Sequence, residues 1–255
     1  MDAEASLRLL VDLHRGLERL GPGSRACTLR ALSLCEGLPS APRVLDAGCG
    51  SGASALVLAE ATGGELTAVD LHPELLDALR DRAQALGLGA RIRTLAADLA
   101  ALPFPAGSFD LIWSEGAIYT VGFDLGLAAL RPLLAPGGWL AVTDLSWFHE
   151  EPPAEAREWW AAEYPAMRSV TENLAAARRL GFEPGGHFAL PAAAWTEGYY
   201  GPLEARLEPF LAAHPGDPAA AAVVEATRQE IALYRRHSSS YGYEFFVLRA
   251  RAGNG

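Results

Sequence analysis

The sequence contains no lysine, and all 21 of its Lys and Arg positions are arginine. A lysine Schiff base and a phosphate-binding loop of the Gly-Lys-Ser type are therefore excluded. Acidic residues outnumber basic ones by 31 to 21, which gives a formal net charge of -10. Because nucleic-acid affinity comes largely from clustered cations, we expect no nucleic-acid partner and favour a small-molecule substrate.

Cysteine is also scarce. Cys27, Cys35 and Cys49 are odd in number and show no Cys-x-x-Cys spacing, so a disulfide framework or a zinc knuckle is not expected. This cysteine usage predicts a cytoplasmic location. No run reaches the roughly 18 apolar residues of a membrane span, and the first residues show no signal-peptide pattern, so we expect no membrane partner.

The most informative stretch of the chain is Val44-Leu45-Asp46-Ala47-Gly48-Cys49-Gly50-Ser51-Gly52. A hydrophobic strand ends at an acidic residue and gives way to three alternating glycines. Glycine lets the backbone turn sharply and approach a ligand closely, and the helix expected over 53–61 would point its N-terminal amides at that ligand. The pattern indicates a site for a nucleotide-type cofactor, although packing alone also explains some glycine-rich turns.

Acidic residues also close the next two expected strands, at Asp70 and Asp98. Three strand-end acids would line one edge of a parallel sheet, the edge at which such folds bind ligands. A nicotinamide-dependent oxidoreductase is disfavoured, because its fingerprint Gly-x-Gly-x-x-Gly is only partly met when Ala53 occupies the last position.

With Asp-x-Gly-x-Gly-x-Gly at 46–52 and acids at 70 and 98, the chain resembles the class I S-adenosylmethionine-dependent methyltransferases. The resemblance covers about 41–147 and continues through Phe109-Asp110-Leu111-Ile112-Trp113-Ser114-Glu115 and the Pro136-Gly137-Gly138 turn. On the segments 21–24, 113–119, 146–148 and 241–246, the chain looks most like the methyltransferases related to the ubiquinone and menaquinone C-methylating enzymes, in a bacterial subgroup of unassigned substrate.

This resemblance implies an α/β fold: a doubly wound, Rossmann-like, seven-stranded sheet with N-terminal helices and an aromatic-rich helical cap. It implies an enzyme that transfers a methyl group from S-adenosylmethionine. The charge balance favours a small organic acceptor, with attack by carbon, oxygen or nitrogen all open. A binding module that holds the cofactor without catalysis, as a sensor or partner subunit, is the alternative. A monomer or a homodimer is expected.

The resemblance also implies roles for single residues. Asp46 would steady the loop and reach the amino group of the methionine moiety, directly or through water. Asp70 would accept from the ribose, and Asp98 from the adenine amino group, with Leu71 and Leu99 on either side of the ring. The alternative for each acid is a cap on the helix that follows. The whole expected cofactor set is Ser24, Asp46, Ala47, Gly48, Cys49, Gly50, Gly52, Asp70, Leu71, Ala97, Asp98, Leu99, Ser114 and Glu115.

Catalysis is expected to rely on alignment, because a sulfonium methyl is already activated. If the acceptor must lose a proton, Glu115 at the end of the fourth strand is the nearest base by topology, with a structural carboxylate as its alternative. Tyr119 would orient the acceptor or pack. His149 is a second candidate base or a surface residue. Together with Glu150 and Glu151 it does not form a metal site, because neighbouring positions rarely converge on one ion.

We expect one domain over 1–255, with N-terminal helices in 1–40, a cofactor-binding core in 41–147, and a substrate cap with the final strands in 148–255. Helices are predicted over 4–20, 24–35, 53–61, 73–86, 125–134 and 219–236, and a closing strand over 243–249. Most aromatic residues lie beyond position 140. They predict a pocket or a core in the cap, built from Trp147, Phe148, Trp159, Trp160, Tyr164, Trp195, Tyr199 and Tyr200.

Overall fold

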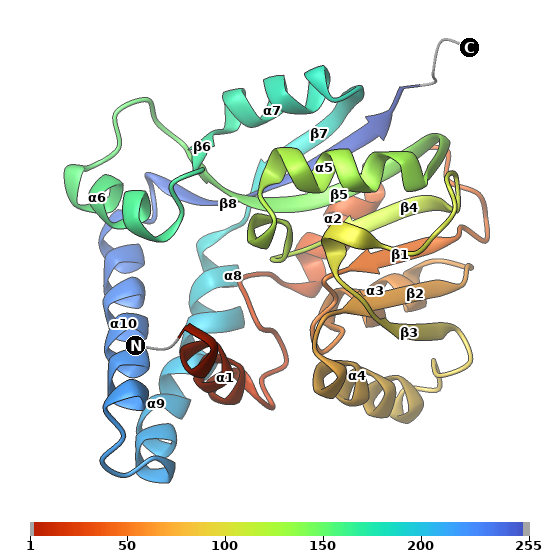
Figure 1. Ribbon diagram of the computed structural model, residues 1–255. Helices are drawn as coiled ribbons and strands as arrows, with labels where there is room; N and C mark the ends of the chain where they lie inside the picture. Colours follow the sequence, from red (N-terminus) through yellow and green to blue (C-terminus); the bar gives the residue numbers. More distant parts are fainter. Residues whose placement is uncertain (1–2, 252–255) are drawn as a thin grey trace.

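The computed structural model describes residues 3–251, and side chains from Arg8 to Arg251. Its centre is a sheet in which seven strands follow the order β3-β2-β1-β4-β5-β8-β7 (Figure 1), and a short β6 pairs with β5. The strands β1 to β5 are parallel, whereas β8 runs antiparallel to both β5 and β7. The expected doubly wound sheet is confirmed, with β6 as an addition. The strand bounds are β1 Val44–Ala47, β2 Leu66–Asp70, β3 Ile92–Ala96, β4 Phe109–Ser114, β5 Leu134–Trp147, β6 Arg168–Ser169, β7 Phe182–Ala189 and β8 Tyr241–Ala250.

Helices cover both faces of the sheet and bury a separate core on each. Alternate residues of a strand point to opposite faces, so in β1 Val44 joins one core while Leu45 joins the other. The core around Leu45 packs against α5 and α7, and the core around Val44 packs against α2, α3, α4, α9 and α10. The helices are α1 Ala3–His14, α2 Arg25–Ser33, α3 Ala53–Ala61, α4 Pro73–Ala85, α5 Phe123–Leu130, α6 Ala154–Glu163, α7 Val170–Arg179, α8 Ala192–Trp195, α9 Gly201–Ala213 and α10 Pro218–His237.

Several expected boundaries change at the N-terminus. The helix predicted over 4–20 ends at His14, because Gly16 adopts a φ of 81°, which an α-helix does not allow. Ser24 caps α2 as expected, since its hydroxyl accepts a hydrogen bond from the Cys27 amide, but α2 ends at Ser33 before the predicted Cys35. The predicted helix over 125–134 is also shorter, since α5 ends at Leu130 and a 3₁₀ turn follows.

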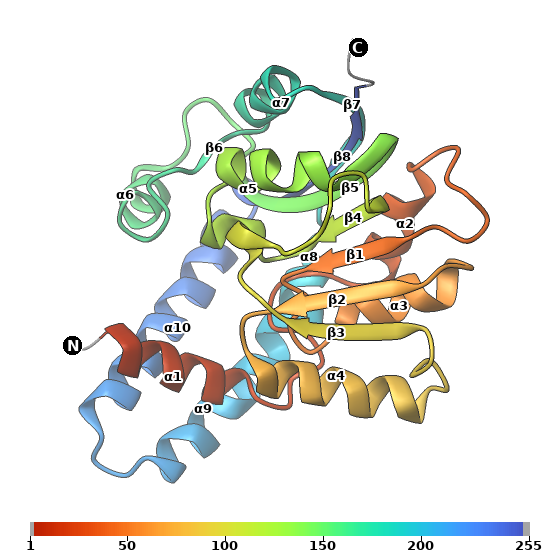
Figure 2. The same ribbon diagram turned by 45° about the vertical axis from the view of Figure 1, so that its right-hand side comes forward.

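The carboxyl ends of the parallel strands face the N-terminal and cap helices. In Figure 2, the arrowheads of β2 and β3 point toward the side of the molecule where α1 and α9 lie. The chain reverses its strand order at β1, which lies between β2 and β4. In open α/β sheets this switch point is where ligands bind. Within residues 3–251, no helix has the length and apolar character needed to cross a membrane.

Candidate active site

A cavity of about 460 Å³ lies at the carboxyl ends of β1 to β4, and we call it the loop-side cavity. The glycine-rich turn forms one wall, with Gly48, Gly50 and Gly52 at φ values of 76°, 53° and 85°. A Cβ at Gly48 would collide with Ala117, and one at Gly52 would collide with Leu79. These glycines are therefore required by the backbone conformation and by packing, and they leave the turn's amides beside the cavity.

Asp70 holds the glycine-rich turn in place. Its Oδ2 accepts a hydrogen bond from the Gly50 amide at 2.8 Å, and its Oδ1 accepts one from the His72 amide at 3.0 Å. A carboxylate has about four lone-pair sites, so two remain for a ligand in the cavity that Asp70 lines. Asp70 can thus support the loop and bind two hydroxyl groups at once.

Asp46 is completely buried behind the turn. Its Oδ2 accepts a hydrogen bond from the Ser54 hydroxyl at 2.9 Å, while Oδ1 has no partner among the described residues. Burial raises the pKa of Asp46 to about 7, and the nearby Glu115 and Asp70 charges add to that rise. Asp46 does not line the cavity itself; Ser54, to which it is bonded, does.

Glu115 is buried and is hydrogen-bonded through both of its side-chain oxygens. Its side chain is 3% exposed, and Oε1 accepts a charge-assisted bond from Arg19 at 2.8 Å. Its Oε2 accepts from the Thr28 hydroxyl at 3.0 Å and from the Trp113 indole at 3.1 Å. Both oxygens are committed to protein donors, so this geometry favours an anchoring carboxylate over a base.

Asp98 and the apolar residues around it complete the far end of the loop-side cavity. One oxygen of Asp98 accepts from the Ala100 amide at 2.8 Å, which is the capping contact that a strand-end acid often makes. Leu71 is 62% exposed, unusually for a large apolar side chain, and lines the cavity together with Leu99. The exposed Leu71 and the buried Leu99 together give the cavity an apolar surface against which a flat, apolar part of a ligand can pack.

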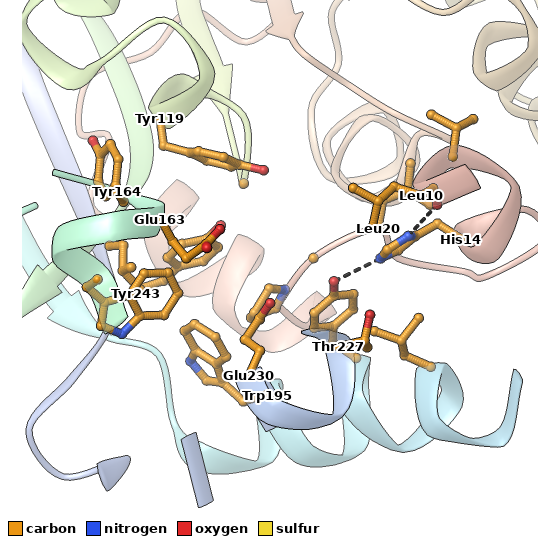
Figure 3. Close-up of a pocket in the computed structure, with 18 of the residues that line it drawn as sticks. Leu10, His14, Leu20, Tyr119, Glu163, Tyr164, Trp195, Thr227, Glu230 and Tyr243 are labelled. Atoms are coloured by element: carbon orange, nitrogen blue, oxygen red, sulfur yellow. Dashed lines mark hydrogen bonds between the residues drawn. The ribbon is translucent and has the colours of Figure 1, made fainter. Parts of the chain in front are cut away.

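A second cavity of about 470 Å³ lies between the sheet and the cap, and we call it the aromatic cavity. Figure 3 shows Tyr119, Tyr164, Trp195 and Tyr243 around it, with the carboxylates of Glu163 and Glu230 directed inward. The two cavities share a set of lining residues from three segments of the chain, namely Leu20, Gly21, Pro22, His72, Leu75, Gly116 and Tyr119. The two cavities are therefore adjacent.

The structure brings most, but not all, of the predicted residues to these cavities. The loop-side cavity is lined by Gly48, Cys49, Gly50, Asp70, Leu71, Ala97, Asp98, Leu99, Glu115 and Tyr119. The residues that it does not bring to either cavity are Ser24, Asp46, Ala47, Gly52, Ser114 and His149. Ser24 is engaged as the α2 cap, and His149 is exposed beyond the end of β5. Burial raises the pKa of the Cys49 thiol, which suits a packing role for it.

Half of the aromatic residues proposed for the cap pocket line the aromatic cavity, namely Trp160, Tyr164, Trp195 and Tyr199. The others, Trp147, Phe148, Trp159 and Tyr200, do not line it. Sequence reasoning missed Arg19, which lines the loop-side cavity, and Glu230, which lines the aromatic cavity. The Arg19–Glu115 pair spans 96 positions, and Glu230 lies inside an amphipathic helix, so neither gave a local signal.

The fold and the site define an α/β protein with a doubly wound sheet and a ligand cavity at its switch point. A crystal structure of an S-adenosylmethionine-dependent methyltransferase from Geobacter sulfurreducens, in complex with S-adenosylhomocysteine, has this fold. It superposes with a TM-score of 0.81 over 96% of this chain and 98% of that one, at 22% identity.

Sequence comparisons identify the family. Residues 44–138 match a methyltransferase domain. The chain is 41% identical over 118 residues to demethylmenaquinone methyltransferase of Thermus thermophilus, covering 45% of this chain and 52% of that protein. It is 33% identical over 181 residues to malonyl-[acyl-carrier protein] O-methyltransferase of Pseudescherichia vulneris, covering 68% and 66%. The chain belongs to the class I S-adenosylmethionine-dependent methyltransferase family, and it spans about half to two thirds of the length of these two relatives.

Proposed function

We propose that the protein binds S-adenosylmethionine in the loop-side cavity and transfers its methyl group to a small organic acceptor in the aromatic cavity. The observation that carries this proposal is the shared lining at Gly116 and Tyr119, where the two cavities meet. A methyl donor and its acceptor must lie in contact and in line for displacement to occur. Two adjacent cavities of about 460 and 470 Å³ provide that arrangement.

The residues present fit the proposed cofactor. Asp70 has free lone pairs for the ribose hydroxyls, and Asp98 lies beside the apolar surface offered by Leu71 and Leu99 for the adenine. Arg19 lines the cavity and uses one guanidinium nitrogen for Glu115, so it is the cation available for the methionine carboxylate. Asp46 lies behind the turn with Oδ1 unpartnered, and its bond to Ser54, which lines the cavity, connects it to the place proposed for the amino group.

When bound, the cofactor supplies a methyl group that is already activated for displacement. The protein's contribution is to hold the acceptor in line and to exclude water, and effective molarities of about 10⁵ to 10⁸ M show how much positioning alone can achieve. Tyr119, 42% exposed and present in both linings, is placed to orient the acceptor. Glu115 acts as a positioning residue through Arg19.

We propose that these parts form one methyltransferase domain. Residues 1–40 and 148–255 contribute α1 and the cap helices over the core of 41–147, and the core around Val44 draws residues from all three segments.

The experiment that tests the proposal is calorimetric titration with S-adenosylmethionine and S-adenosylhomocysteine, with NADH as the control. Micromolar binding of the first two without binding of NADH is expected. Absence of binding by both would refute the assignment of the loop-side cavity. Binding without any methylated product from metabolite extracts would favour a non-catalytic sensor.

A further inference from the structure

The aromatic cavity has negative charge and no fixed positive charge. Its described lining includes Glu163 and Glu230 but no arginine, and the chain has no lysine. Neither carboxylate forms an ion pair with any residue between 8 and 251 for which the structure gives a side chain. We infer that the methyl acceptor is an amine, bound through Glu230 and the surrounding aromatic rings; this inference rests on the function proposed above.

His14 does not supply a compensating charge to this lining. His14 donates from Nδ1 to the Leu10 carbonyl at 2.8 Å, so its Nε2 accepts from the Tyr199 hydroxyl at 2.9 Å. Burial lowers the pKa of His14, which keeps the ring neutral. His72 lies in the part shared with the loop-side cavity, with Nδ1 at 3.8 Å from Glu74. The described lining therefore offers an anionic acceptor no arginine, no lysine and no charge from His14.

Three hydroxyl groups of the lining, those of Tyr199, Tyr164 and Thr227, have already committed their protons. Tyr199 donates to His14, Tyr164 donates to Asp144 at 3.1 Å, and Thr227 donates to the Val223 carbonyl at 2.9 Å. Each of these oxygens can therefore only accept a further hydrogen bond. The N–H groups of an amine can donate to these three oxygens, whereas a carboxylate or phosphate, which only accepts, cannot.

Glu230 is the acidic group that lies deepest in this lining. Its Oε1 accepts from the Tyr200 hydroxyl at 2.8 Å, and Figure 3 shows the carboxylate pointing into the space beside Trp195. Burial raises the pKa of Glu230, so its negative charge is costly until a cation arrives. Aromatic rings attract cations, and indole attracts them most strongly, so the presence of Trp160 and Trp195 in the lining favours a cationic ligand.

The same charges favour methyl transfer to nitrogen. The lone pair of the neutral amine forms the N–C bond while the S–C bond breaks and its electron pair goes to sulfur. The positive charge thus moves from sulfur to the amine nitrogen, and an acceptor that arrives as an ammonium ion first releases its proton to solvent. Because cationic charge develops on the acceptor during transfer, carboxylates fixed nearby stabilise the transition state. A phenolate would instead be repelled on binding.

The test uses probes that share one ring and differ in charge: benzyldimethylamine and benzyltrimethylammonium as cations, benzyl alcohol as the neutral probe, and benzoate as the anion. Binding of S-adenosylhomocysteine is measured first, so failure of the proposed function is seen separately. The probes are then titrated into the complex with S-adenosylhomocysteine, and tryptophan fluorescence and calorimetry report binding. We expect both cations to bind and benzoate not to bind.

Glu230→Gln should weaken benzyldimethylamine binding by about tenfold to a hundredfold, the loss expected for a charge-assisted hydrogen bond, and leave S-adenosylhomocysteine affinity unchanged. The matched control is Glu225→Gln, which removes an exposed charge from the same helix, α10, and should leave both affinities unchanged. Equal or tighter binding of benzyl alcohol or benzoate, no saturable binding of either cation, or an unchanged benzyldimethylamine affinity in Glu230→Gln would each overturn the inference.

Discussion

Without cofactor, the Asp46→Asn variant should be more stable than the wild-type protein, and this difference in the free energy of unfolding should grow as the pH rises. The carboxyl is 0% exposed, and its pKa rises from 3.8 to about 7 on folding. Below pH 3.8 the group is neutral in both states and ionisation costs nothing. Between pH 3.8 and about pH 7, Asp46 ionises in the unfolded chain but stays neutral in the folded protein. The free energy of unfolding of the wild-type protein therefore falls as the pH rises toward and through the folded pKa. A difference of about three pH units corresponds to about 4 kcal/mol.

The variant should not show this loss, because an amide does not titrate. We expect the gain of Asp46→Asn over wild type in urea denaturation to grow by about 2.5 kcal/mol between about pH 5 and about pH 8, and then to level. Asp144, whose pKa burial also raises to about 7, is present in both proteins and cancels. A gain that is the same at both pH values would refute the reasoning.

The same substitution should weaken S-adenosylhomocysteine binding, since a neutral amide replaces the carboxylate expected near the cofactor's amino group. Calorimetry at about pH 8, where Asp46 is ionised in wild type, gives the clearest comparison. A gain in stability together with a loss of affinity is the relation expected when a buried charge is kept for function. Unchanged affinity would remove Asp46 from the cofactor site.

Three further substitutions separate the roles of the other acids and of the second candidate base. Asp70→Ala should raise the dissociation constant for S-adenosylhomocysteine by about tenfold or more, because it removes the ribose acceptor and the support of Gly50; circular dichroism should show an intact fold, and an unchanged constant would contradict the assignment. Glu115→Gln should lower cofactor affinity by releasing Arg19 while turnover at saturating cofactor stays close to wild type, so a large loss of turnover would identify a base instead. His149→Ala should change neither affinity nor turnover, since the ring is exposed and outside both cavities; a drop in turnover would restore it as a candidate.

The sheet and the glycine-rich turn could be predicted because their signals are local. Strand, turn and helix follow one another within a few residues at 44–61, and the predicted bounds of α3 agree with the structure. The strand β7 had no such signal, since Pro184, Gly185 and Gly186 interrupt its alternation and coincide with an irregular register against β8. The short β6 is held by tertiary pairing with β5 alone.

The acceptor side was less predictable, because its chemistry comes from residues that share no local pattern. An abundance of aromatic residues beyond position 140 predicted a pocket or a core, and the structure uses them for both: Trp160 and Tyr199 line the aromatic cavity, whereas Tyr200 packs in the core and donates to Glu230. Only the folded chain shows that Glu163 and Glu230 meet in this lining without an arginine among its residues, and that juxtaposition carries the inference about the acceptor.

The segment 19–23 lies between the two cavities and is hydrogen-bonded to the protein at both of its ends. At one end Arg19 is bonded to Glu115 beside β4, and at the other the Gly23 amide donates to the Ala194 carbonyl in the cap at 3.1 Å. Residues 20–22 between these anchors line both cavities. A Cβ at Gly23 would collide with Glu115, so the glycine is required by this packing. One short segment thus fixes the cofactor side and the acceptor side relative to each other, which is the condition that an in-line displacement imposes.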